Sequence, residues 1–158
     1  MSYSKSLLLY QDKPAYGLLL KLIVVIVPVG FLVTSIYLWF SGENTGGLVM
    51  LAEAFFIGLI FWIIFPRRYQ VYEDHLRIVL GGPFAVKIGF NRITAVEVTS
   101  RIGFTINFVT RITKTYVRIV KRGGLDVAIA PKSSDSFVEN ANQALGQWSK
   151  VKLETGVD

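Results

Sequence analysis

Two observations predict a membrane-spanning α-helical hairpin followed by a mainly-β domain that a C-terminal helix closes. The first is a pair of long apolar runs near the N-terminus, at residues 22–40 and 47–65. The second is a change to alternating apolar and polar residues after Pro66, which is typical of β-strands. We therefore expect residues 1–66 to hold an N-terminal segment and the hairpin, and residues 67–158 to form one extramembrane domain.

Each apolar run has the length of a transmembrane helix. Nineteen residues give about 28 Å of α-helix, which matches the hydrocarbon core of a bilayer. A cleaved secretory signal is the alternative for the first run. Signal cores are shorter and end in small residues, whereas this run ends in Tyr37, Trp39 and Phe40, which are typical of a membrane interface. The sequence therefore predicts an integral membrane protein.

The basic residues beside the two spans predict the orientation of the hairpin. Lys5, Lys13 and Lys21 precede the first span, and Arg67 and Arg68 follow the second. The connecting loop contains no Lys or Arg. Because basic residues concentrate on the cytoplasmic side of a membrane, we expect both termini in the cytoplasm.

One acidic residue, Glu53, interrupts the second apolar run. Acids inside a membrane often mark functional sites, but Glu53 has no second acidic or basic side chain in either span with which to form a relay. A carboxylate that snorkels or forms a local hydrogen bond is the alternative. If the hairpin is an accessory subunit of a membrane transporter complex, Glu53 should matter more than the domain.

The extramembrane part reads as a series of short strands separated by turn residues. Glu73-Asp74, Gly81-Gly82-Pro83 and Gly123-Gly124 mark the turns. Residues 100–113 are less regular, but their apolar residues alternate well enough for one more strand. The predicted strands lie at residues 68–72, 75–80, 84–88, 93–99, 115–121 and 126–130.

A C-terminal helix is predicted after Pro131, which ends the last strand. Phe137, Ala141, Leu145 and Trp148 recur at helical spacing across residues 135–150. The domain should therefore contain six or seven strands closed by one amphipathic helix.

This arrangement resembles the bacterial pleckstrin-homology-like (PH-like) domain family over residues 66–148. The resemblance rests on FPRRYQVYEDHLRI at residues 65–78, IGFNRI at 88–93, and VAIAP at 127–131 followed by Phe137. It implies a bent, partly open barrel of about seven strands, capped by the C-terminal helix. Eukaryotic relatives hold inositol phosphates with basic residues at the first hairpin turn. Here that turn is Glu73-Asp74, so phosphoinositide recognition of that type is not expected.

The net charge of +6 lies in the extramembrane domain. No acidic residue occurs between Val98 and Leu125, so this stretch is the longest run of single-sign charge. We expect it, with the basic neck after the second span, to face anionic lipids or a partner; an ordinary solvated sheet face is the alternative. The candidate residues are Arg67, Arg68, Arg101, Arg111, Lys114, Arg118, Lys121 and Arg122.

The sequence offers little for catalysis, for a metal or for a cofactor. Cysteine is absent and His75 is the only histidine. His75 follows Asp74, and adjacent strand residues point to opposite faces, so we expect them not to act as a catalytic pair. Nucleic-acid binding is also not expected, because base-stacking modules are not matched and the protein is tethered to a membrane.

The combined prediction is a non-enzymatic, membrane-anchored module for binding or assembly. Its partners would be the lipid bilayer and a membrane protein or a second copy of the chain, with anionic lipids as a further ligand. Phe104 and Phe108 are the candidate partner contacts, since they exceed the needs of a small core. The alternatives are the transporter accessory subunit, an anionic-lipid-binding module, and an assembly factor similar in layout to those of photosystem I.

Overall fold

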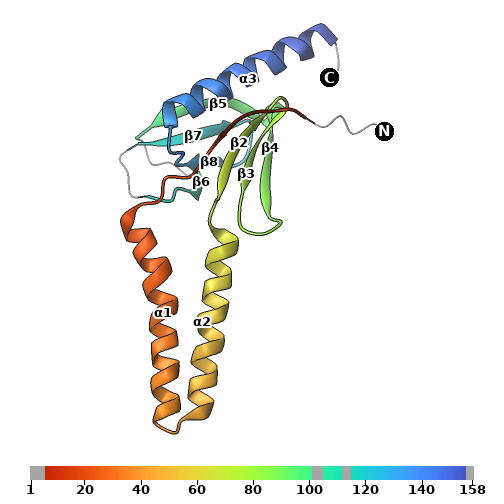
Figure 1. Ribbon diagram of the computed structural model, residues 1–158. Coiled ribbons are helices and arrows are strands. Elements are labelled where there is room, and N and C mark those ends of the chain that lie inside the picture. Colours follow the sequence, from red (N-terminus) through yellow and green to blue (C-terminus); the bar gives the residue numbers. More distant parts are fainter. Residues whose placement is uncertain (1–5, 101–104, 112–114, 156–158) are drawn as a thin grey trace.

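The N-terminal half of the molecule is a pair of long antiparallel helices. The computed structural model describes residues 6–100, 105–111 and 115–155. Helix α1 (Leu18–Phe40) and helix α2 (Asn44–Ile64) stand side by side below the rest of the molecule, and both are long and apolar enough to cross a membrane (Figure 1). The hydroxyl of Ser35 donates a hydrogen bond to the carbonyl of Gly47 at 2.7 Å, which links the helices near their connecting loop. The two predicted helices are confirmed.

A four-stranded antiparallel sheet combines one strand from before the hairpin with three strands from after it. The sheet has the order β1-β2-β3-β4, so β1 pairs with β2 although both transmembrane-length helices lie between them in the chain. The sequence prediction missed β1. Its short apolar run carries no local strand signal, and its pairing partner β2 lies far along the chain. The strands are β1 (Leu8–Asp12), β2 (Arg68–Tyr72), β3 (His75–Val79) and β4 (Ala85–Gly89).

The second sheet has the order β5-β7-β8-β6, in which β6 runs parallel to β8. A short 3-10 helix, η1 (Phe90–Arg92), joins the two sheets. The strands β2 to β8 confirm the seven predicted strands, and helix α3 (Ser134–Thr155) confirms the C-terminal helix and extends it. The strands of this sheet are β5 (Ile93–Thr99), β6 (Thr105–Phe108), β7 (Tyr116–Lys121) and β8 (Asp126–Ile129).

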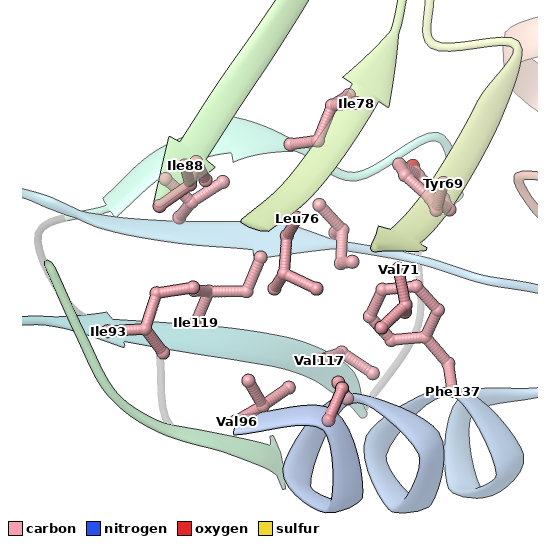
Figure 2. Close-up of a cluster of buried hydrophobic side chains, with 14 of the residues drawn as sticks. Tyr69, Val71, Leu76, Ile78, Ile88, Ile93, Val96, Val117, Ile119 and Phe137 are labelled. Atoms are coloured by element: carbon pink, nitrogen blue, oxygen red, sulfur yellow. The ribbon is translucent and has the colours of Figure 1, made fainter. Parts of the chain in front are cut away.

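The hydrophobic core lies between the two sheets and the inner face of α3 (Figure 2). Leu76 and Ile78 of β3 alternate inward and are almost completely buried. Phe137 of α3 makes an edge contact with Tyr69 of β2, with ring centroids 6.2 Å apart. Burying an aromatic ring of this size contributes about 2 to 3 kcal/mol, so Phe137 is a main attachment point of α3.

The chain before α1 crosses the domain as a strap, which we define as residues 7–17. Beyond β1, the backbone N–H of Ala15 donates to the carbonyl of Ala130 at 2.8 Å, and that of Gly17 donates to Thr110 at 2.9 Å. The buried Thr110 hydroxyl donates in turn to the carbonyl of Ala15 at 2.8 Å. The sheet of the domain therefore includes residues that precede the hairpin.

The other end of the hairpin is also fixed to the domain. The turn between β3 and β4, residues 80–84, lies against the last turn of α2, where the N–H of Gly81 donates to the carbonyl of Ile63 at 3.3 Å. A Cβ atom added at Gly81 would lie only 1.6 Å from the carbonyl oxygen of Trp62, so this close approach requires glycine. The Tyr16 hydroxyl also donates to the carbonyl of Pro66, which joins the two helix ends.

Replacing Gly81 with Ala is therefore expected to destabilise the junction between the domain and α2. The clash is with a backbone oxygen that cannot rotate away, and such overpacking costs about 1 to 3 kcal/mol. The melting temperature of the full chain in detergent measures the effect. Gly146→Ala is the matched control, because its added Cβ meets no atom within 4 Å in a helical position, and it should be neutral or stabilising. Equal melting temperatures for the two variants would contradict the packing of the turn on α2.

Candidate functional site

A hollow on the domain lies between the C-terminal half of α3, η1, the start of β5 and the β7–β8 turn. We call it the distal groove; its volume is about 560 Å³. Leu145, Trp148, Ser149 and Lys152 line it from α3, at a spacing that places all four on one face of the helix. Arg122 lines it from the β7–β8 turn. One face of α3, η1, the start of β5 and the β7–β8 turn therefore form the walls.

The chemistry of the groove is aromatic and cationic. Trp148 contacts Phe90 edge to face with ring centroids 6.2 Å apart, which forms the apolar floor. The ammonium of Lys152 lies 6.0 Å from the centre of the Trp148 ring. Among the described residues that line the groove, none is acidic. Leu153 at the rim is 84% exposed, so the helix presents an unburied apolar side chain there.

The distal groove lies on the side of the domain away from the hairpin. In Figure 1, α3 covers the end of the domain opposite α1 and α2. Strand β4 starts beside the turn that contacts α2 and leads to Phe90 on the groove floor. Its five residues, about 16 Å of extended strand, lie between that turn and the groove floor.

The structure distributes the predicted basic residues over several places. Arg122 faces the distal groove, whereas Arg67 lies at the neck, with its guanidinium 5.4 Å from the centre of the Trp62 ring. Arg68 is exposed at the start of β2. Arg101 and Lys114 lie outside the described residues. The described members of the set therefore do not form one continuous surface.

Arg118 is held by acidic neighbours. Its guanidinium is 2.6 Å from the carboxylate of Asp126 and 3.9 Å from that of Glu97. Its charge is therefore compensated within the sheet. Lys121 is half-buried, and its backbone N–H donates to Asp126 at 2.9 Å.

Arg111 lies near the start of α1. It lines a cavity of about 500 Å³ together with Leu18, Leu19 and Thr110. Its side-chain Nε is buried and has no hydrogen-bond partner in the described part of the chain. Arg111 therefore lies where the hairpin enters the domain, apart from the distal groove.

The predicted partner contacts and Glu53 have different surroundings. Phe104 lies outside the described residues. Phe108 is half-buried against the core, and its carbonyl accepts a hydrogen bond from the Tyr69 hydroxyl at 3.1 Å. Glu53 is exposed on the surface of α2. Its role in binding stays a prediction, as does that of Phe108.

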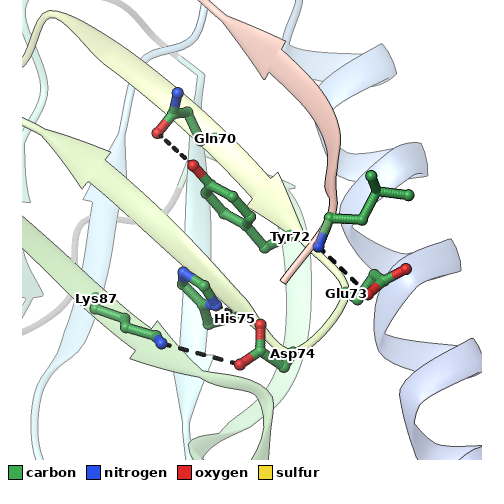
Figure 3. Close-up of polar contacts among 7 residues, drawn as sticks. Gln70, Tyr72, Glu73, Asp74, His75 and Lys87 are labelled. Atoms are coloured by element: carbon green, nitrogen blue, oxygen red, sulfur yellow. Dashed lines mark hydrogen bonds and ion pairs between the residues drawn. The ribbon is translucent and has the colours of Figure 1, made fainter. Parts of the chain in front are cut away.

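A polar network surrounds His75 at the β2–β3 turn (Figure 3). The expectation that His75 and Asp74 point apart is wrong: His75 Nδ1 lies 2.5 Å from an oxygen of Asp74. The reason is that Asp74 belongs to the turn, where the alternation of a strand does not apply. Tyr72 stacks on the imidazole with ring centroids 4.5 Å apart. Because the ring is buried under Tyr72, it is poorly placed to meet a substrate.

The acidic groups of this turn also hold neighbouring elements. Burial opposes ionisation of Asp74, but hydrogen bonds from His75 and Ser6 outweigh it and lower the pKa of its carboxyl group. Glu73 accepts a hydrogen bond from the backbone N–H of Leu7 at 3.3 Å, and Lys87 lies 3.9 Å from Asp74. The network therefore fastens the beginning of the strap. Within the described residues, no group of three His, Asp or Glu side chains is arranged to hold a metal ion.

Comparison with known proteins identifies one family. Residues 67–143 match the family model of the bacterial PH domain. No curated protein and no solved structure matches the chain. The match begins after α2 and ends within α3, so β1, the hairpin and the part of α3 that lines the distal groove lie outside it.

Replacing Asp126 with Asn should weaken the dependence of stability on pH below about 4. The backbone N–H of Lys121 and then the guanidinium of Arg118 lower the pKa of Asp126, although burial opposes this. A lowered pKa in the folded state gives stability that is present above the unfolded pKa of about 3.9 and is lost as the pH falls through the folded value. Melting temperatures measured between neutral and strongly acidic pH should therefore fall less steeply for Asp126→Asn. The exposed Glu139→Gln is the control and should follow the wild-type curve.

Proposed function

Because residues 67–143 form a bacterial PH domain, we propose that the chain is a membrane-anchored module for binding or assembly. The module presents this domain at the cytoplasmic face of a bacterial membrane, where it meets a membrane-protein partner. The observation that carries the proposal is that both ends of the hairpin are hydrogen-bonded to the domain. Gly17 bonds to Thr110 immediately before α1, and Gly81 bonds to Ile63 in the last turn of α2.

These contacts restrict the position of the domain. Only Phe65, Pro66 and Arg67 separate α2 from β2, so no flexible linker lies between the membrane-length helix and the sheet. A domain held in this way meets other proteins of the same membrane at high effective concentration. Weak contacts are then sufficient for a specific complex.

The cytoplasmic orientation is supported by the basic neck. Arg67 and Arg68 follow α2 directly, and the loop between the helices carries no Lys or Arg. Stacking of Arg67 on Trp62 places a cation and an aromatic ring where α2 ends, which is the composition of a membrane interface.

The proposed orientation can be tested by cysteine labelling, because the chain contains no cysteine. Glu43→Cys lies in the loop between the helices and should react with a membrane-impermeant maleimide in intact cells. Lys87→Cys is exposed on the domain and should react only after the cells are permeabilised. The reverse pattern would place the domain on the outer side.

The binding role can be tested by photo-crosslinking with the full chain in its native membrane. A photoreactive amino acid is placed at Leu125 or Leu153 of the domain, and at Phe40 or Phe55 of the hairpin, all of which are exposed. We expect the domain positions to crosslink to one membrane protein that the hairpin positions do not reach. Crosslinks from the hairpin positions alone would instead support the transporter accessory subunit and contradict the proposal.

A further inference from the structure

We propose that the distal groove binds an acidic segment of the partner protein that inserts an apolar side chain between α3 and η1. This inference rests on the proposed binding function and names the site and the chemistry of its ligand. Arg122 and Lys152 supply positive charge from two different elements, and no described lining residue is acidic. A segment rich in Asp or Glu complements this charge, whereas a basic segment would be repelled.

The apolar part of the ligand is accommodated by the aromatic floor. Trp148 and Phe90 meet edge to face, and Leu145 and Leu153 lie on either side along α3. A cavity of about 560 Å³ is large enough for an aromatic or branched aliphatic side chain. Aromatic rings bordered by cations are typical of energetically dominant contacts in protein interfaces.

A lipid headgroup of the same membrane is not the expected occupant. The five residues of β4, about 16 Å of extended strand, separate the turn that contacts α2 from Phe90 on the groove floor. The headgroup region extends only about 5 to 8 Å beyond the hydrocarbon core on each side. A protein segment that rises from the membrane can cover this distance, whereas a headgroup cannot.

Addition of a strand to β5 is also not the expected mode of binding. Strand β5 is an edge of its sheet, but the side-chain amide of Asn142 closes the middle of that edge. Asn142 accepts a hydrogen bond from the N–H of Val96 at 3.3 Å and donates one to its carbonyl at 2.8 Å. The ligand would therefore be held by its side chains in the groove.

The experiment uses the purified full chain in lipid nanodiscs and a library of short peptides. The library combines acidic, neutral and basic residues around a central Leu, Phe or Trp. We expect the bound fraction to be enriched in acidic peptides with an apolar centre. Enrichment of neutral or basic peptides, or no enrichment, would overturn the proposal. Binding of vesicles of anionic phospholipid, without enrichment of any peptide class, would overturn the proposal and assign the groove to lipid instead.

Substitutions then locate the binding site. For an enriched acidic peptide, the double variant Arg122→Gln and Lys152→Gln should weaken binding by about tenfold or more, since each residue contributes charge to the groove. Leu153→Ser should also weaken binding, and its exposed position removes little from the folded core. Lys87→Gln removes an exposed cation from the other sheet and is the matched control. Equal weakening by Lys87→Gln would show a general charge effect and contradict the assignment.

Failure of this inference can be distinguished from failure of the proposed function. If domain positions crosslink to a membrane protein but the groove variants leave acidic-peptide binding unchanged, the proposed binding function is supported and the assignment of the groove is wrong. If the domain positions crosslink to no protein and the wild-type groove still selects acidic peptides, the groove assignment holds and the membrane-partner role fails.

Discussion

The pairing of β1 with β2 is the interaction on which the arrangement of the whole molecule depends. It brings together two segments that both long helices separate in the chain. Closing such a long connection would normally cost conformational entropy. Here α1 and α2 run antiparallel and return the chain to its starting level, so the ends of the hairpin arrive already close together. Helix packing therefore supports the sheet, and the sheet in turn holds the helices at a fixed place on the domain.

This closure gives the molecule two ends of different character. Near the hairpin lie Trp62, Arg67 and the turn that contains Gly81, with the aromatic and cationic character of a membrane interface. At the opposite end, α3 and η1 enclose the distal groove. The domain between these two ends has a single hydrophobic core, which is continuous from one sheet to α3.

The charge pattern shows why a linear run of basic residues does not define a surface. The sequence between Val98 and Leu125 lacks acids, yet Arg118 is compensated by Glu97 from β5 and Asp126 from β8. These acids lie outside the run in sequence but beside it in the sheet. Arg122, directly after β7, instead lines the distal groove. Cross-strand neighbours therefore decide which basic residues remain available for a ligand.

The sequence by itself determined both long helices, the seven strands from β2 to β8 and the helix that closes the domain, because hydrophobic period and turn residues are local signals. It also determined the bacterial PH family, whose residues lie in one continuous stretch. Only the tertiary structure decided that β1 belongs to the sheet, that Asp74 meets His75, and that α3 and η1 form a groove. Each of these depends on residues brought together by packing across long separations, and no local pattern of hydrophobicity or charge encodes such contacts.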